Sequence, residues 1–195
     1  MPKVDIKRRR IRAKIVYYGP GLSGKTANVQ YISDHMDPEK KGRMRTLHVK
    51  GAGEQYIEVL PIQFEPLSDF DMIYNLCTVP GKASLKRARK NVLKGLDGVV
   101  FVADSRQSRL LANLDCLDDL RDNLTNFDIN LEEVPHVIQY NRRDCNNVAP
   151  VRELRSKLNS YGVLEFEAVA SQGQGVMETM RAIVRKVRDD IERRL

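Results

Sequence analysis

The sequence contains no tryptophan, few aromatic residues and only three cysteines. Aromatic residues make up 6% of the 195 residues, and they provide no stacking platform among the basic residues, so we expect no nucleic-acid partner. Cys77, Cys116 and Cys145 are odd in number and far apart, which argues against a disulfide framework and favours a reducing cytoplasm. The three histidines are isolated from one another and from the cysteines, so a zinc site is not expected either.

Long apolar runs are also absent, since no stretch approaches the ~20 residues that a membrane-spanning helix needs. The first ten residues, MPKVDIKRRR, lack the apolar core of a secretory signal, and neither end carries a lipidation motif. Hydrophobic residues at 42% and charged residues at 30% are typical of a globular protein. A chain of this length most simply forms one domain spanning residues 1–195.

Positive charge is in excess, with a net charge of +7. One interpretation is that the basic residues belong to a solvated edge strand and a solvated helix face. The other is that they attract an anionic membrane surface or an acidic partner. The excess is concentrated in residues 82–90 and, near the N-terminus, in Lys3, Lys7, Arg8, Arg9, Arg10, Arg12 and Lys14.

Short apolar runs alternate with helical patterns along the chain, which predicts an α/β fold with a mostly parallel sheet and helices on both faces. Leucines recur at helical spacing over residues 110–124, as do apolar residues over 176–191. No helix separates the second and third predicted strands, so we expect one antiparallel edge strand there. Residues 37–55 lack periodicity and are expected to form a functional or mobile loop. The predicted strands are 15–18, 57–60, 72–79, 99–103, 137–140 and 166–170.

A phosphate-binding loop follows the first of these strands, where GPGLSGKT runs from Gly19 to Thr26. Its glycines allow the backbone N–H groups to approach phosphate oxygens, and the helix that follows adds its dipole. Lys25 is expected to reach the β- and γ-phosphates, and the Thr26 hydroxyl to bind Mg²⁺. The candidate phosphate-binding residues are Gly19, Gly21, Leu22, Ser23, Gly24, Lys25, Thr26 and Ala27.

A second motif, NRRD, follows the strand 137–140. The Asp144 carboxylate can accept hydrogen bonds from the N1–H and the exocyclic amine of guanine, whereas adenine offers no such pair. We expect Asn141 to tie this loop to the phosphate-binding loop, and Arg142 to lie along the face of the purine. Together the two motifs predict a guanine-nucleotide-binding domain.

These motifs resemble the MglA family, bacterial Ras-like small GTPases that set cell polarity in gliding and twitching bacteria. The resemblance covers nearly the whole chain and includes IVYYGPGLSGKT from Ile15, TVPG from Thr78, LKGLDGVVFVADS from Leu93 and VIQYNRRD from Val137. It implies a Ras-like sheet, GDP or GTP with Mg²⁺ as ligands, and cytoplasmic, in part polar, localisation. It also implies a Roadblock-domain regulator (MglB) and motility or polarity effectors as partners. By the same comparison, the nucleotide is further contacted by Gly81, Ala170 and Ser171, and the metal by Thr78 together with Thr26.

The chain departs from the family where hydrolysis is catalysed. Lys82 stands where the family has the glutamine that orients water, and an ammonium group has no acceptor for the proton of that water. Ala52, Gly53 and Glu54 replace the family's Asp-Arg-Thr, so its arginine finger is missing. Because such a finger contributes roughly 10³–10⁵ in rate, we assign no catalytic residue and expect GTP hydrolysis to be very slow or lost.

Three other functions are compatible with part of the pattern. The chain could be an active GTPase completed by an activator in trans, or by Arg43 or Arg45. It could instead be a nucleotide-independent scaffold in which the phosphate-binding loop is a relic. A small P-loop kinase is disfavoured because Asn141 and Asp144 have no purpose in such an enzyme.

Overall fold

The computed structural model describes residues 2–48, 56–81 and 84–195. Ala52, Gly53, Glu54 and Lys82, on which the prediction of slow hydrolysis depends, lie outside the described residues.

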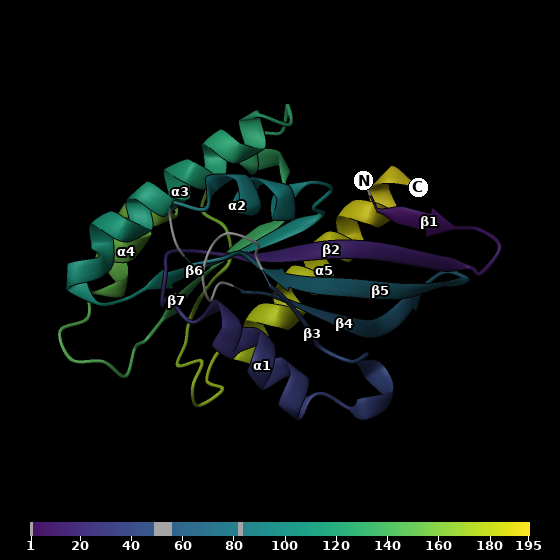
Figure 1. Cartoon of the computed structure of the whole chain (residues 1–195), viewed down its shortest axis with the longest axis horizontal. Helices are drawn as coiled ribbons and strands as arrows, with labels where there is room; N and C mark the ends of the chain where they lie inside the picture. The colour runs from purple at the N-terminus through teal and green to yellow at the C-terminus, as the bar shows by residue number, and fades with distance from the viewer. Residues whose placement is uncertain (1, 49–55, 82–83) are drawn as a thin grey trace.

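Within the described residues, eight strands form one sheet in the order β3-β4-β5-β2-β6-β7-β8, with β1 beside β2 (Figure 1). β2 lies parallel to β5 and β6, and the parallel arrangement continues through β7 to β8. The predicted α/β fold with a mostly parallel sheet is therefore confirmed. The strands are β1 (Lys3–Asp5), β2 (Arg10–Tyr18), β3 (Arg45–His48), β4 (Tyr56–Leu67), β5 (Phe70–Thr78), β6 (Gly98–Asp104), β7 (His136–Asn141) and β8 (Glu165–Glu167).

The antiparallel edge of the sheet is wider than predicted. β4 pairs with β5 as expected, but β3 adds a further antiparallel strand outside it, and β1 pairs antiparallel with β2. All residues of β1 and β3 are exposed, so neither strand shows the apolar alternation that marks a half-buried strand. The predicted strand 57–60 is too short, since β4 continues to Leu67 with Ile62 and Leu67 buried, and β5 begins at Phe70.

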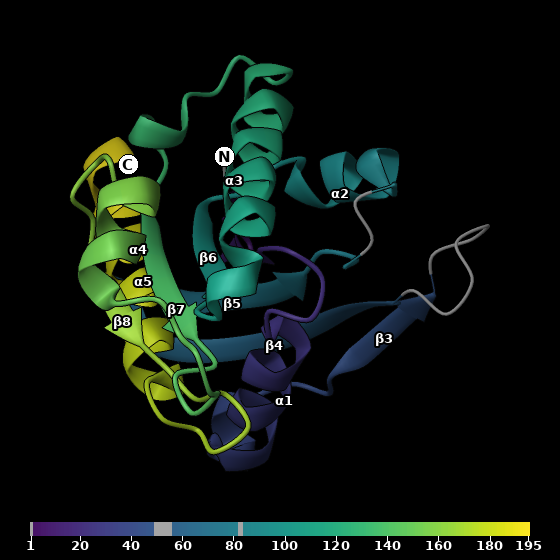
Figure 2. The same cartoon turned by 90° about the vertical axis from the view of Figure 1, so that its left-hand side faces the viewer.

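Helices cover both faces of the sheet (Figure 2). α1 (Lys25–His35) and α5 (Val176–Arg194) pack with one set of buried residues, including Ile32 and Ile183. α2 (Lys86–Leu93), α3 (Leu110–Thr125) and α4 (Val151–Leu158) pack with the other. Short 3₁₀ turns occur at η1 (Pro38–Lys40), η2 (Gln107–Arg109) and η3 (Leu131–Glu133).

The two helices predicted from apolar spacing are present as α3 and α5. In α5 every residue of the predicted stripe, Val176, Met180, Ile183, Val187 and Ile191, is at most 1% exposed. The predicted strand 166–170 is shorter than expected, since β8 ends at Glu167. In the part of the chain that the structure describes, no helix is both long and apolar enough to cross a bilayer.

The parallel strands direct their carboxyl ends to one edge of the sheet. The phosphate-binding loop follows β2, Asp104 ends β6 and Asn141 ends β7. Ligands of open α/β sheets bind at this edge, so the fold gathers the loops that the sequence marked as functional.

Candidate functional site

The backbone of the phosphate-binding loop admits only glycine at two positions. Gly19 and Gly24 have φ angles of 155° and 101°, which L-residues with a side chain rarely adopt. A Cβ on Gly19 would lie 2.2 Å from the Val102 carbonyl oxygen, and one on Gly24 would lie 2.1 Å from Asn141 Nδ2. The loop therefore packs tightly against β6 and β7, and its shape is set by those contacts.

Lys25, the first residue of α1, is buried with 6% exposure. Its ammonium group donates hydrogen bonds to the carbonyl oxygens of Gly19, at 3.0 Å, and Pro20, at 2.8 Å. Burial lowers the pKa of Lys25 from its usual 10.5 to about 8, because the surroundings disfavour the charged form. The loop thus holds a desolvated ammonium group at its centre, which an anionic ligand would stabilise.

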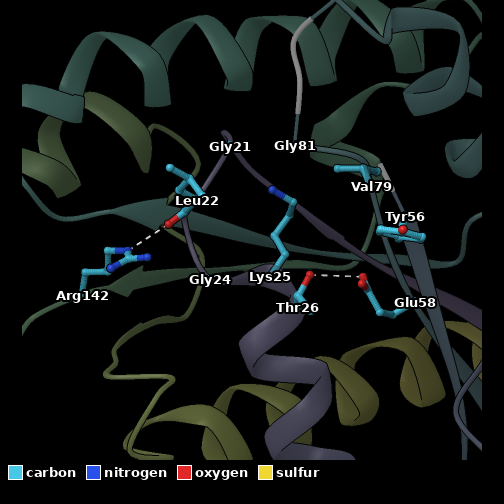
Figure 3. A pocket seen from close by; sticks show the side chains of 10 residues that line it. All are labelled: Gly21, Leu22, Gly24, Lys25, Thr26, Tyr56, Glu58, Val79, Gly81 and Arg142. Atoms are coloured by element: carbon cyan, nitrogen blue, oxygen red, sulfur yellow. Dashed lines mark hydrogen bonds between the residues drawn. The ribbon is translucent and has the colours of Figure 1, made fainter. Parts of the chain in front are cut away.

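A pocket of about 550 Å³ opens in front of this loop. Figure 3 shows Arg142 on one side of it, Lys25 at its centre, and Glu58 with Tyr56 on the other side. The lining is completed by four residues of the phosphate-binding loop and by the segment that follows β5. The residues that complete the lining are Gly21, Leu22, Gly24, Thr26, Val79 and Gly81.

Three oxygen-bearing side chains meet beside Lys25. Thr26 Oγ1 donates a hydrogen bond of 3.2 Å to Glu58 Oε2, and Thr78 Oγ1 donates to the same oxygen. The Glu58 N–H donates in turn to Thr78 Oγ1 at 2.9 Å. Mg²⁺ prefers oxygen ligands of this kind, so the residues present fit the predicted metal. Thr26 and Thr78, which the sequence marked as metal ligands, are brought together by Glu58.

Glu58 was missed by the sequence analysis, although a signal was available. In β4 it shares the inward face with Leu60 and Ile62, at positions 58, 60 and 62, and it is only 8% exposed. A charged residue among the inward positions of a strand costs free energy unless it is paired or binds a ligand. That pattern could have marked Glu58 as a functional candidate.

The loop that carries Asp144 is joined to the phosphate-binding loop by a hydrogen bond of Asn141. Its Nδ2 donates to the Ser23 carbonyl oxygen at 2.7 Å, and its Oδ1 accepts from the Ala170 N–H at 2.8 Å. Arg142 Nε donates to the Leu22 carbonyl oxygen at 2.8 Å (Figure 3). Three segments that are distant in the sequence therefore form one connected unit around the pocket.

Comparison with known proteins agrees with this geometry. A model of the ADP-ribosylation factor family matches residues 7–187. The protein named "Mutual gliding-motility protein MglA" of Myxococcus xanthus (strain DK1622) is 40% identical over 193 residues, which cover 99% of each chain. This chain belongs to the MglA-like small GTPases. The family predicted from the sequence is confirmed.

This MglA-like GTPase holds a further charged cluster that the sequence analysis did not assign. Asp104 is fully buried, and its carboxylate pairs with Arg106 at 2.6 Å, Arg109 at 3.8 Å and Arg142 at 3.9 Å. Arg109 also donates to the Gly21 carbonyl oxygen at 3.0 Å. Two of the three arginines thus hold carbonyl groups of the phosphate-binding loop, whereas the guanidinium of Arg106 donates to Asp104.

The predicted site residues of the MglA-like GTPase lie in and around the pocket, with Thr78 joined to the lining residue Glu58. Seven of them line the pocket, Gly19 and Ser23 belong to the phosphate-binding loop, and Ala27 lies in the first turn of α1. Asn141 and Ala170 are connected to that loop by hydrogen bonds, while Asp144 and Ser171 are exposed in neighbouring loops. Arg43 and Arg45 are exposed and do not belong to the described pocket lining. The ligand contacts of all these residues remain predictions.

Proposed function

We propose that the chain is a guanine-nucleotide-binding molecular switch of cell polarity or motility, with GTP hydrolysis that is very slow or lost. The observation that carries the proposal is the pair of hydrogen bonds made by Asn141. The bond to Ser23 ties the loop of Asp144 to the loop of Lys25, and the bond from Ala170 ties it to the segment after β8. The connected loops would then set the distance between phosphates bound at Lys25 and a base bound at Asp144. A relic of a binding site would not need this connection.

Guanine specificity is assigned to Asp144, whose exposed carboxylate can accept two hydrogen bonds from the base. Arg142 would lie along the purine, with its Nε held by the Leu22 carbonyl oxygen. Ser171 would present its backbone N–H to the guanine O6, while the Ala170 N–H, which donates to Asn141 Oδ1, holds this segment in place. An adenine base would leave the carboxylate without donors, and this is the source of the expected discrimination.

Calorimetry with GDP and ADP tests this assignment. We expect GDP to bind at least 100-fold more tightly, on the scale of sites that read hydrogen-bond donors. Asp144→Asn should lose most of the preference, because an amide offers one acceptor and a clashing donor pair. Equal affinities for the two nucleotides would refute guanine specificity, and no binding of either would favour the nucleotide-independent scaffold.

Thr26, Glu58 and Thr78 would hold Mg²⁺, which when bound neutralises phosphate charge. The hydroxyl groups of Thr26 and Thr78, which now donate to the Glu58 carboxylate, would instead share the cation with it. We expect Glu58→Gln to reduce the dependence of GDP release on Mg²⁺, measured as the acceleration that EDTA produces. An unchanged EDTA effect would contradict the role of Glu58.

The proposal of slow hydrolysis depends on Lys82 and Gly53, which lie outside the described residues, so it rests on the sequence. We expect single-turnover GTP cleavage no faster than ~10⁻⁴ per second, the scale of an unassisted Ras-like site. A Roadblock-domain regulator is the proposed partner, because the sequence motifs resemble those of the MglA family. Addition of such a regulator separates the alternatives, because strong acceleration would make the chain an active GTPase completed in trans.

A further inference from the structure

The hairpin formed by β1 and β2 carries a dense group of cations. Residues 3–9 and Arg12 are exposed, and the turn that joins the strands is Ile6-Lys7-Arg8-Arg9. We call residues 3–12 the basic hairpin. Its cations are Lys3, Lys7, Arg8, Arg9, Arg10 and Arg12.

Carboxylates offset only part of this charge. Asp5 pairs with Arg8 at 4.0 Å, Asp69 with Arg9 at 3.5 Å, and Asp71 with Arg10 at 3.7 Å. The basic hairpin has six cations against these three carboxylates. It therefore keeps an excess of three positive charges, out of the +7 of the whole chain. The side chains of the Arg9–Asp69 pair are 70% and 78% exposed, and exposed pairs of this kind are readily exchanged for other ionic partners.

Two features of the basic hairpin are not explained by solvation of an edge strand. Ile6 in the turn is 77% exposed and Val4 is 43% exposed, whereas charge alone is enough to keep an edge strand from pairing with another chain. Arg9 adopts a φ of 46°, a conformation that glycine or asparagine would adopt at lower cost. A cation is thus kept at a strained position beside an exposed aliphatic side chain.

The basic hairpin and the phosphate-binding loop lie at opposite ends of β2. The hairpin turn precedes Arg10, and Gly19 follows Tyr18, which places the two ends roughly 30 Å apart for a strand of this length. Figure 1 shows the turn at one extremity of the molecule and the start of α1 toward the other. A surface bound by the hairpin would leave the pocket accessible.

We propose that the basic hairpin binds the surface of a bilayer that contains anionic phospholipid, with Ile6 placed among the headgroups. Cations supply the attraction to anionic lipid, and an exposed aliphatic side chain between them suits the boundary between headgroups and acyl chains. A nucleic acid would use the cations but would gain nothing from Ile6, and the hairpin has no aromatic residue on which a base could stack. The binding does not require a nucleotide.

Vesicle sedimentation with the full chain tests the proposal. Vesicles of phosphatidylcholine with 30 mol% phosphatidylglycerol are compared with pure phosphatidylcholine, at low and high salt. The double variant Lys7→Gln, Arg8→Gln removes two exposed cations of the turn. The matched control is Arg181→Gln, Arg185→Gln, which removes two exposed cations of α5 and lowers the net charge equally. Ile6→Ser tests the aliphatic contact, and thermal melts verify that each variant folds.

We expect the wild type to sediment with the anionic vesicles only, and high salt to release it. At roughly fivefold per cation, the hairpin variant should lose about 30-fold in affinity, whereas the control loses severalfold less. Ile6→Ser should weaken binding at low salt without changing the salt dependence. The proposal is overturned if the control variant loses as much as the hairpin variant, or if Ile6→Ser binds like the wild type. It is also overturned if the hairpin binds duplex DNA and no vesicle.

Discussion

The contact between Arg109 and the phosphate-binding loop predicts how fast nucleotide is released. Arg109 donates to the carbonyl oxygen of Gly21 at 3.0 Å, so the guanidinium holds the orientation of the peptide that joins Gly21 to Leu22. In Arg109→Ala this peptide is free to rotate. We expect faster release of GDP, with little change in fold.

The magnitude follows from the exposure of the arginine. A hydrogen bond from a charged donor contributes about 1.5–3 kcal/mol, and the Arg109 side chain is 32% exposed, which favours a value below that range. We take about 1 kcal/mol, which corresponds to roughly fivefold faster release.

Arg106 provides the matched control, because it pairs with the same Asp104 carboxylate at 2.6 Å and its other contact to that carboxylate is a second hydrogen bond at 3.0 Å. Arg106→Ala should therefore lower the free energy of unfolding at least as much as Arg109→Ala, while it leaves release nearly unchanged. Release is measured with a fluorescent GDP analogue chased by excess GDP, and stability by urea unfolding. If both variants release nucleotide equally fast, the contact with Gly21 has no role. If Arg109→Lys releases nucleotide at the wild-type rate, the charge at this position and not the geometry of the hydrogen bond slows release.

Three further predictions concern other parts of the molecule. Burial lowers the pKa of Lys25 to about 8, so the empty folded chain binds fewer protons than the unfolded chain between about pH 8 and 10.5, and its stability from this group rises with pH there. The affinity for GDP, which needs the charged ammonium group, should fall roughly tenfold between pH 7 and 9 in calorimetry, and a Lys25→Met variant should lack this fall. Arg89 is 2% exposed and pairs with Asp119 at 3.0 Å, so Arg89→Met should lower the free energy of unfolding in urea by about 3–5 kcal/mol. Adding Asp119→Asn to this variant should recover part of the loss. Full additivity of the two substitutions would contradict an interaction between the two side chains. Lys82→Gln combined with Gly53→Arg should accelerate single-turnover GTP cleavage by more than the product of the single substitutions, whereas a wild type that is already fast would show that other residues do this work.

Local patterns in the sequence determined the phosphate-binding loop and the main helices. The spacing of Gly19, Gly24 and Lys25 is meaningful by itself, since the contacts of a loop with a ligand are made by neighbouring residues of one segment. The apolar stripe of α5 is equally local, because a helix repeats every 3.6 residues whatever it packs against. The NRRD motif follows a predicted strand, as the phosphate-binding loop does. Its position therefore predicted that Asn141 connects the two loops.

Tertiary structure decided the features that depend on strand pairing. β3 has no apolar alternation, and its place at the edge follows only from its pairing with β4. Glu58 becomes a neighbour of Thr78 because β4 and β5 pair in a particular register, and of Thr26 because α1 starts beside that pair. Arg109, which pairs with Asp104, meets Gly21 because parallel strands that are far apart in the sequence end at one edge of the sheet. The hydrogen bonds of Glu58 with Thr78 and Thr26, and of Arg109 with Gly21, join residues separated by 20 to 88 positions. A pattern of neighbouring residues carries no information about that separation.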